Sequence, residues 1–111
     1  MRATWYARYS SSNQEETSIA DQFRLCQNLT AQQGWTVVSK HSDEKISGAT
    51  AFRPGFEALQ RDIVAGLVDV VVAEALDRIS RDQEHTARFY KACRFRGVKI
   101  VTVSEGEIGE L

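Results

Sequence analysis

The segment YARYSSS places a tyrosine, an arginine and three serines close together near the N-terminus. An isolated serine hydroxyl is a weak nucleophile and needs activation by neighbouring groups. Side chains alternate along a strand, so Tyr6, Arg8 and Ser10 would point to one face, with Arg8 beside Ser10. Alternatively, Arg8 is a solvated charge at a strand end and the serines are loop residues. The spacing alone leaves both interpretations open.

The segment LDRISRD is a second polar cluster, and it follows a strongly apolar run. Arg78 and Arg81 are three residues apart, so a helical turn would bring them to one side. Two guanidiniums that keep their protons form a strong clamp for phosphate or sulfate. Alternatively, Asp77 pairs with an arginine, while Ser80 or Asp82 caps the helix that follows. The cap and the clamp are compatible.

A third cluster is DEKISGATAFR, which contains Asp43, Ser47, Gly48 and Arg53. Arg53 directly precedes Pro54, a residue favoured in the first turn of a helix. Arg53 would therefore lie at a helix N-terminus, a position that favours anions. As a single signal this cluster is weak.

Together these clusters favour chemistry at a phosphodiester over peptide hydrolysis. Charge builds on the non-bridging oxygens during phosphoryl transfer, and fixed guanidiniums stabilise it where other enzymes use metal ions. A positive local potential also favours loss of the serine proton. His41 and His85 are the only histidines, and no CxxC pair or His/Cys cluster indicates a metal site. The residue types therefore give no indication of a metal site.

The elements that would position the clusters alternate between strand and helix. The expected order is strand 3–10, helix 18–34, strand 35–43, helix 53–66, strand 68–76, helix 84–97 and strand 98–104. Such alternation predicts an α/β fold, a three-layer sandwich with a mainly parallel four-stranded sheet between helices. The nearly continuous apolar run VDVVVAEAL is typical of a central parallel strand. Sites in such sheets form at the carboxyl ends of the strands, where all three clusters lie.

Local signals mark the ends of these elements. Ser18 is a candidate N-cap for the first helix and Gly34 a candidate stop. DRISRDQ is expected to be a polar loop and EGEIGEL a polar end. Cys26 and Cys93 fall among apolar residues of the expected helices and are interpreted as reduced, buried thiols.

Length and composition restrict the class of protein. The 111 residues suit one domain, and the net charge of -1 gives no electrostatic footprint for non-specific nucleic-acid binding. A nucleic-acid partner would therefore need affinity from elsewhere in a longer protein. No long apolar run predicts a membrane span and no signal-peptide pattern is present, so a cytoplasmic location is expected.

Four sequence motifs together resemble those of a known protein family. In order and spacing, YARYSSSNQ, SIADQ, DEKISGATAFRPGF and LDRISRD resemble the catalytic domain of serine recombinases, the resolvase/invertase family. The variant with GW.VV, ISGA..RPGF and EG is most similar to the large serine recombinases and integrases. The resemblance runs over nearly the whole chain and implies a resolvase-like fold with flavodoxin-like topology. One departure, Ile79 in place of the commoner leucine, keeps the apolar packing.

The resemblance implies a reaction and the residues that perform it. Ser10 matches the nucleophile that attacks a DNA phosphate, giving a 5′-phosphoserine and a 3′-hydroxyl before strand exchange and religation. Arg8, Arg78 and Arg81 match the arginines that bind and activate the scissile phosphate. Arg53 matches a supporting arginine. The family uses no metal and no nucleotide, so no cofactor is expected. Rejoining needs no ATP, because the phosphoserine bond keeps the phosphodiester energy.

Further positions follow from the same resemblance. Asp77 matches the acidic partner, which orients arginines and aids proton transfer to the leaving oxygen. The remaining supporting positions are Tyr6, Gln22, Asp43 and Ser47. Ser11 and Ser12 fall outside the nucleophile position and are expected to be loop residues.

The resemblance also implies partners. The family acts on DNA as homodimers that synapse into tetramers. Its members continue with a long dimerisation helix and C-terminal DNA-binding domains, so residues 1–111 are expected to be a truncated catalytic domain. Such a fragment would be inactive alone and monomeric or weakly self-associating.

Two other classes of function remain as alternatives. A non-catalytic anion-binding or interaction domain could share the fold, but it would be free to lose Ser10 or an arginine, and none is lost. A small-molecule phosphatase is disfavoured. It would usually have a cysteine nucleophile in a phosphate loop, a set of metal-binding carboxylates or a catalytic histidine, and none of these is recognisable in the sequence. The clustered charges also predict that Arg78→Ala stabilises the unliganded domain.

Overall fold

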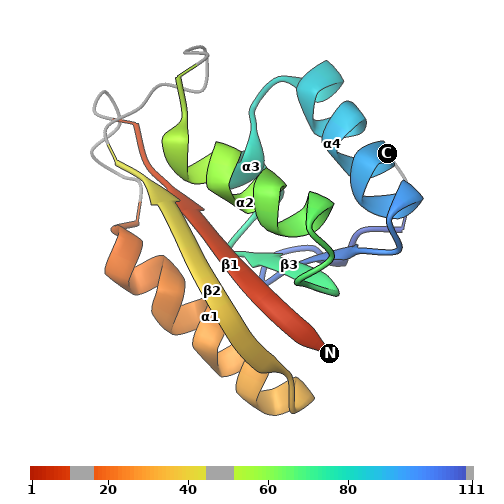
Figure 1. Cartoon of the computed structure of the whole chain (residues 1–111). Coiled ribbons are helices and arrows are strands. Elements are labelled where there is room, and N and C mark those ends of the chain that lie inside the picture. Colours follow the sequence, from red (N-terminus) through yellow and green to blue (C-terminus); the bar gives the residue numbers. More distant parts are fainter. Residues whose placement is uncertain (11–16, 45–51, 110–111) are drawn as a thin grey trace.

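The computed structural model describes residues 1–10, 17–44 and 52–109. Within these ranges strands and helices alternate from the N-terminus (Figure 1). The elements are β1 (Arg2–Arg8), α1 (Ile19–Gln33), β2 (Thr36–Asp43), α2 (Pro54–Val64), β3 (Val70–Ala73), α3 (Leu76–Ile79), α4 (Gln83–Phe95), β4 (Lys99–Thr102) and β5 (Gly106–Glu107).

The strands form one sheet in the order β2-β1-β3-β4-β5. The first four are parallel, and β5 runs antiparallel to β4. The predicted mainly parallel α/β sheet is confirmed, and β5 adds a fifth strand to the four expected. This strand forms where a polar end was predicted, because Gly106 adopts φ 77° and lets the chain turn back beside β4. A two-residue strand carries no apolar pattern that would reveal it.

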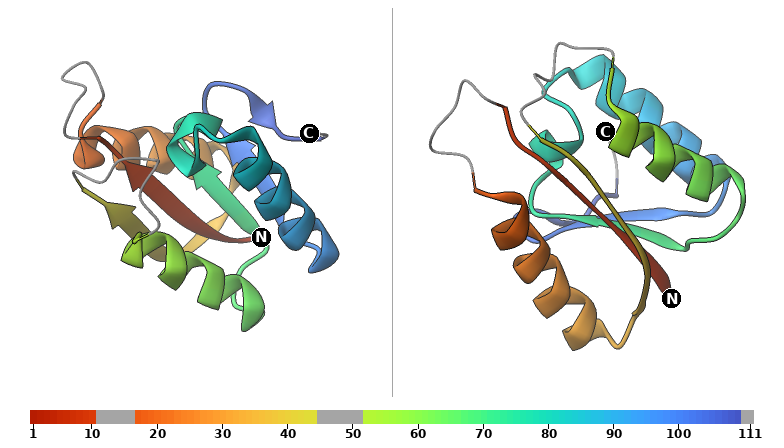
Figure 2. Two further views of the ribbon diagram at one scale, coloured as in Figure 1. Left: turned by 90° about the horizontal axis from the view of Figure 1, so that it is seen from above. Right: turned by 60° about the vertical axis from the view of Figure 1, so that its left-hand side comes forward.

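The helices cover both faces of the sheet. Figure 2 shows α1 on one side of the strands and α2 on the other. The core is accordingly divided in two: Trp5 and Cys26 belong to a cluster on the α1 face, while Tyr6, Phe56 and Phe89 belong to a cluster under α2 and α4. The alternation of side chains along β1 therefore separates Trp5 from Tyr6.

The central strand β3 is fully buried. Val70 and Val72 face the α1 side, and Val71 faces the α2 and α4 side. The strand ends at Ala73, earlier than predicted. The short helix α3 begins three residues later, at Leu76, so it includes the last residue of the predicted strand and the start of the predicted loop.

The predicted caps are present. Ser18 accepts a hydrogen bond from the N–H of Asp21, and Gly34 ends α1 with φ 72°. Asp82 caps α4 by accepting from the first N–H groups of that helix. Both cysteines are free and buried, and burial raises the pKa of each thiol to about 12. They are therefore unreactive packing residues.

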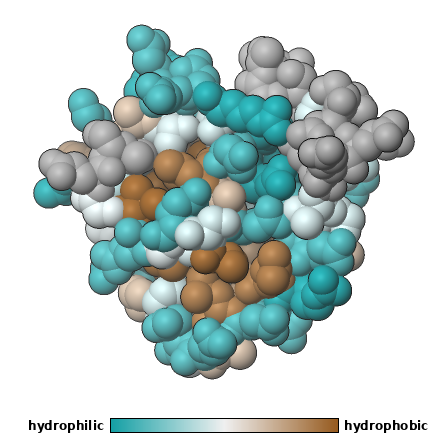
Figure 3. All heavy atoms as spheres, turned by 180° about the vertical axis from the view of Figure 1, so that it is seen from behind, coloured by the Kyte–Doolittle hydropathy of each residue, from teal (hydrophilic) through white to brown (hydrophobic). Residues whose placement is uncertain are grey.

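On the rear face, apolar side chains gather near the centre and hydrophilic side chains surround them (Figure 3). The most exposed large apolar side chains include Phe95 at 87 % and Phe52 at 70 %. Among the residues that the structure describes, no helix has the length and apolarity to cross a membrane.

Candidate active site

Gln22 of α1 fixes the end of the strand that leads to Ser10. β1 pairs with β3 only as far as Trp5, so the backbone of Arg8 has no strand partner on that side. The Gln22 amide takes this place: its oxygen accepts from the N–H of Arg8 at 3.2 Å, and its nitrogen donates to the Arg8 carbonyl at 3.0 Å. The same nitrogen donates to the Thr17 carbonyl at 2.9 Å. Gln22 therefore ties α1 to the end of β1.

The Arg8 side chain joins β1 to α3. Arg8 is fully buried, and its guanidinium donates from Nε to the carbonyl of Arg78 at 3.0 Å and from Nη2 to the carbonyl of Asp77 at 2.7 Å. Carbonyls at the end of a helix have no partner inside the helix, so a buried end needs side-chain donors. Arg8 thus positions the turn that carries Asp77 and Arg78.

Arg53 performs a related task from the start of α2. Its Nη2 donates to the Tyr6 hydroxyl at 2.8 Å and to the carbonyl of Ile79 at 2.5 Å. The guanidinium also lies 4.4 Å from the centre of the Phe56 ring, a cation–π contact. Arg53 is 5 % exposed, so its side chain folds into the protein.

An anion does lie at the N-terminus of α2, but it is the carboxylate of Asp43. One Asp43 oxygen accepts from the N–H of Gly55 at 2.8 Å, and the other accepts from the N–H of Phe56 at 3.0 Å. Arg53 lies at the N-terminus of α2 as predicted, and the protein's own Asp43 carboxylate occupies the position that favours an anion. The contact requires Gly55, because a Cβ there would collide with the carbonyl of Ser42 at the end of β2.

Tyr6 links these two groups. Its hydroxyl donates to Asp43 at 2.7 Å and accepts from Arg53. Burial is the main cause that raises the pKa of the Tyr6 phenol well above its ordinary value. Tyr6 therefore stays protonated and serves as a fixed bridge.

Arg78 pairs with a residue that the sequence interpretation missed. Its Nη2 lies 3.0 Å from Oε1 of Glu74, and its Nε donates to the same oxygen at 3.3 Å. Thr17 donates to the other Glu74 oxygen at 2.5 Å. Two signals could have revealed Glu74: it continues the alternation of Val70 and Val72, and it stands four residues before Arg78.

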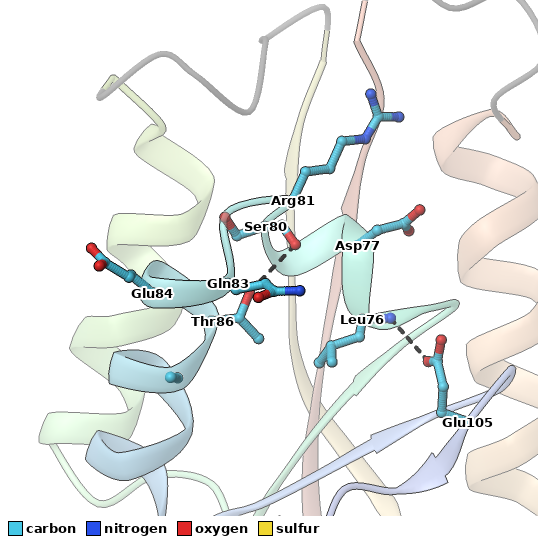
Figure 4. A pocket seen from close by; sticks show the side chains of 9 residues that line it. Leu76, Asp77, Ser80, Arg81, Gln83, Glu84, Thr86 and Glu105 are labelled. Carbon is cyan, nitrogen blue, oxygen red and sulfur yellow. Dashed lines mark hydrogen bonds between the residues drawn. The ribbon is translucent and has the colours of Figure 1, made fainter. Parts of the chain in front are cut away.

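Glu105 is a second missed residue. Its carboxylate accepts from the N–H of Leu76 at 3.0 Å and from the Thr102 hydroxyl. It thereby holds the start of α3 from the turn after β4. A cavity of about 760 Å³ lies beside this contact, bounded by α3, the start of α4 and Glu105 (Figure 4).

Arg81 and Asp77 occupy more open positions than the other candidates. Arg81 is exposed, and in Figure 4 its side chain extends away from Leu76 and Glu105, which also line the cavity. The Asp77 side chain is 55 % exposed, with an oxygen 3.8 Å from Nε of Arg78.

The remaining serine candidates differ in what the structure describes. Ser10 lies two residues beyond β1 and is buried. Ser47, Ser11 and Ser12 lie outside the described residues.

The structure therefore brings most of the predicted residues to one edge of the sheet. One set of contacts joins Tyr6, Asp43 and Arg53, and a second joins Gln22, Arg8 and the turn that bears Asp77 and Arg78. The two sets meet at α3, where Arg53 donates to the carbonyl of Ile79. No group of three His, Cys, Asp or Glu side chains among the described residues could hold a metal ion. The arrangement is an arginine-rich edge beside a serine, with backbone carbonyls and carboxylates orienting the guanidiniums.

Comparison with known proteins identifies the class. Residues 3–110 match the family model "Resolvase, N terminal domain", and the chain belongs to this family. The resolvases of transposon Tn501 from Pseudomonas aeruginosa and of transposons Tn1721 from Escherichia coli are 36 % identical to it over 80 residues. This stretch is 72 % of the chain and 42 % of each resolvase, so the chain spans less than half of these curated relatives.

Solved structures give the same fold and place it among serine recombinase catalytic domains. The N-terminal catalytic domain of TP901-1 integrase superposes with a TM-score of 0.86 at 25 % identity, covering 96 % of this chain and 79 % of that one. The C-terminal catalytic domain of ISC1926 TnpA, an IS607-like serine recombinase, gives 0.83 at 32 % identity, covering 93 % and 70 %. The chain thus has the fold of the resolvase-type catalytic domains.

Proposed function

We propose that this chain is the catalytic domain of a site-specific DNA recombinase in which Ser10 is the nucleophile. The Ser10 oxygen forms a bond to phosphorus while the bond from phosphorus to the 3′ oxygen breaks. The serine gives up its proton and the leaving 3′ oxygen gains one. Religation is the reverse reaction with the 3′-hydroxyl of the exchanged strand. The observation that carries this proposal is the direct contact of Arg8, two residues before Ser10, with the turn that bears Arg78.

The arginines divide into two groups in this proposal. Arg78 and Arg81 bind the non-bridging oxygens of the scissile phosphate, because guanidiniums match that geometry and stay charged. Arg8 and Arg53 add positive charge and hold α3 through its carbonyls. The exposed carboxyl of Asp77 orients Arg78 and assists protonation of the leaving oxygen.

The remaining supporting residues position these groups. Tyr6, Gln22 and Asp43 fix the ends of β1, α1 and α2, and Ser47 belongs to the same site by its place in the motif. In this proposal no metal takes part, and religation needs no nucleotide because the phosphoserine linkage retains the energy of the phosphodiester.

DNA is the proposed substrate of the longer protein, which assembles as a dimer and then as a synaptic tetramer. With a net charge of -1, this domain alone would bind DNA weakly. We also propose that the protein is located in the cytoplasm, where it would meet its DNA substrate. We expect residues 1–111 alone to give no recombination.

The test uses the full-length parent protein and end-labelled DNA from the junction of its mobile element. After a detergent quench, we expect a covalent protein–DNA band that carries label on the 5′ side. Ser10→Ala should abolish the band, whereas Ser11→Ala and Ser12→Ala should retain it. A band that survives Ser10→Ala would assign the nucleophile elsewhere.

A second candidate function is a non-catalytic anion-binding or interaction domain. It is favoured by the fact that Arg8 and Arg53 direct donors to backbone carbonyls, which a purely structural role would also explain. The same assay separates the two. DNA that is bound but never joined to protein, by wild type or variant, would support the non-catalytic domain.

A further inference from the structure

Glu74 lies where β3 ends, on the face of the sheet that α1 covers. Its side chain is only 14 % exposed. A carboxylate in such a position is unfavourable unless charged or polar partners surround it. Glu74 has two: Arg78 contacts one carboxylate oxygen through Nε and Nη2, and Thr17 donates to the other. The carboxylate therefore bridges α3 to the residue before the cap of α1.

This bridge closes a ring of contacts around the strand end that precedes Ser10. Thr17 binds Glu74 through its hydroxyl and Gln22 through its carbonyl. Gln22 holds the Arg8 backbone, and the Arg8 side chain holds the carbonyl of Arg78. Arg78 returns to Glu74 at 3.0 Å. Each neighbour in the ring comes from a different element or element end, so the ring fixes their relative placement.

We propose that Glu74 is a positioning residue that orients the Arg78 guanidinium and links it, through Thr17 and Gln22, to the strand end that carries the nucleophile. This proposal depends on the proposed function, because it assigns Arg78 to the scissile phosphate. Two contacts to one edge of the guanidinium restrict its rotation, whereas a single contact would let it turn. Glu74 acts before DNA arrives and touches no reacting atom.

The experiment compares covalent cleavage by full-length wild type, Glu74→Gln and Glu74→Ala at increasing DNA concentration. Misplacing a reacting or binding group by about 1 Å costs roughly 100-fold in rate. We expect Glu74→Ala to lower the rate at saturating DNA by about 10- to 100-fold and to leave half-saturation within about twofold. Glu74→Gln keeps an oxygen acceptor, so its loss should be smaller.

A matched control is Glu107→Gln. Glu107 also pairs with a basic residue, Lys99, at 3.6 Å, but at the opposite end of the sheet. Its rate and half-saturation should equal those of wild type. Thr17→Ala should reproduce part of the Glu74→Ala loss, and Thr17→Ser should restore it because the hydroxyl returns.

A double-mutant cycle tests whether Glu74 acts through Arg78. In an Arg78→Lys background with measurable residual cleavage, Glu74→Ala should cause little further loss. Full additivity of the two losses would overturn the proposal. So would a faster rate with Glu74→Gln, since that result would mean the carboxylate only opposes the DNA charge.

The outcomes also separate this proposal from the function on which it rests. Wild type that binds DNA without forming a Ser10-dependent covalent band would overturn the proposed function. A normal covalent band in wild type and an equal rate in Glu74→Ala would overturn the role of Glu74 alone. If Glu74→Ala does not fold, Glu74→Gln gives the decision instead, and a rate equal to that of wild type would overturn the role of Glu74.

Discussion

The two ends of the parallel sheet use the same kinds of side chain in opposite ways. At the amino ends, Arg2 pairs with Asp69, and their side chains are 50 % and 38 % exposed. At the carboxyl ends, Arg8 is fully buried, and the Arg78 side chain is 10 % exposed against Glu74. Arg2 and Asp69 are thus solvated, whereas Arg8 and Arg78 are held by carbonyls and a carboxylate inside the fold.

This difference shows that arginine side chains at the carboxyl end are desolvated and, in return, hold fixed positions. Burying an arginine is costly unless its donors are satisfied, and α3 satisfies those of Arg8 with two carbonyls. A solvated pair such as Arg2 and Asp69 needs no such arrangement and fixes little. The carboxyl end is therefore the part of the molecule in which charged side chains have defined positions.

The largest expected effect comes from removing the most buried charge. Arg8→Ala leaves the carbonyls of Asp77 and Arg78 without donors in a buried place, which should lower the free energy of unfolding by about 3 kcal/mol. Urea unfolding followed by circular dichroism measures it. The matched control is Arg2→Ala at the solvated end, which should change the urea midpoint little. Equal effects of the two variants would contradict the comparison.

Gly55→Ala should have the next largest effect. The added Cβ would collide with the carbonyl of Ser42, so β2 and the start of α2 must separate, at a cost of about 2 kcal/mol. Gly109→Ala is the control, because a Cβ there meets no atom within 4 Å. The melting temperatures of both variants, measured by thermal unfolding, test this prediction. If Gly55→Ala melted at the same temperature as Gly109→Ala, the backbone at this end of the sheet would be able to move apart at little cost.

Much of the fold was predictable because local patterns were strong. The apolar run of β3, the Ser18 and Asp82 caps and Gly34 gave the strand–helix alternation, the helix boundaries and the site edge. The order of the motifs then indicated the residues at that edge. For Arg8 and Arg53, the sequence was sufficient to predict that both residues lie at the carboxyl end of the sheet.

What the sequence could not predict is how those arginines use their donors. The contact of Arg8 with the Asp77 carbonyl joins residues 69 positions apart, and no local period encodes it. Glu74 was missed because it stands inside a run interpreted as a nearly continuous apolar strand. Asp43 was predicted as a site residue, but its capping of α2 depends on the close approach of Gly55.

Arg78→Ala should have a smaller effect on the free energy of unfolding, and it tests the buried pair at the carboxyl end of the sheet. The sequence predicted stabilisation from relief of repulsion, but the structure pairs Arg78 with Glu74 and changes that expectation. Removing Arg78 leaves a largely buried carboxylate with fewer partners, so we expect a loss of about 1.5 kcal/mol, discounted for the partial exposure of the pair. Glu74→Ala in the same background should recover part of it. Stabilisation by Arg78→Ala in urea unfolding would show that repulsion dominates.

The smallest effect concerns the solvated end and its response to acid. Arg2 holds the pKa of the Asp69 carboxyl at about 2, below its ordinary value, mainly through hydrogen bonds. A carboxyl whose folded pKa is depressed contributes stability above its unfolded pKa and loses it as the pH falls through the folded value. The loss should therefore fall between about pH 4 and pH 2, taking about 3.9 for unfolded Asp. It should be absent in Asp69→Asn and weaker at high salt, because exposed charges are screened. Urea midpoints across this pH range measure it, and an acid limb that is identical in wild type and Asp69→Asn would show that this pair, though well formed, contributes nothing.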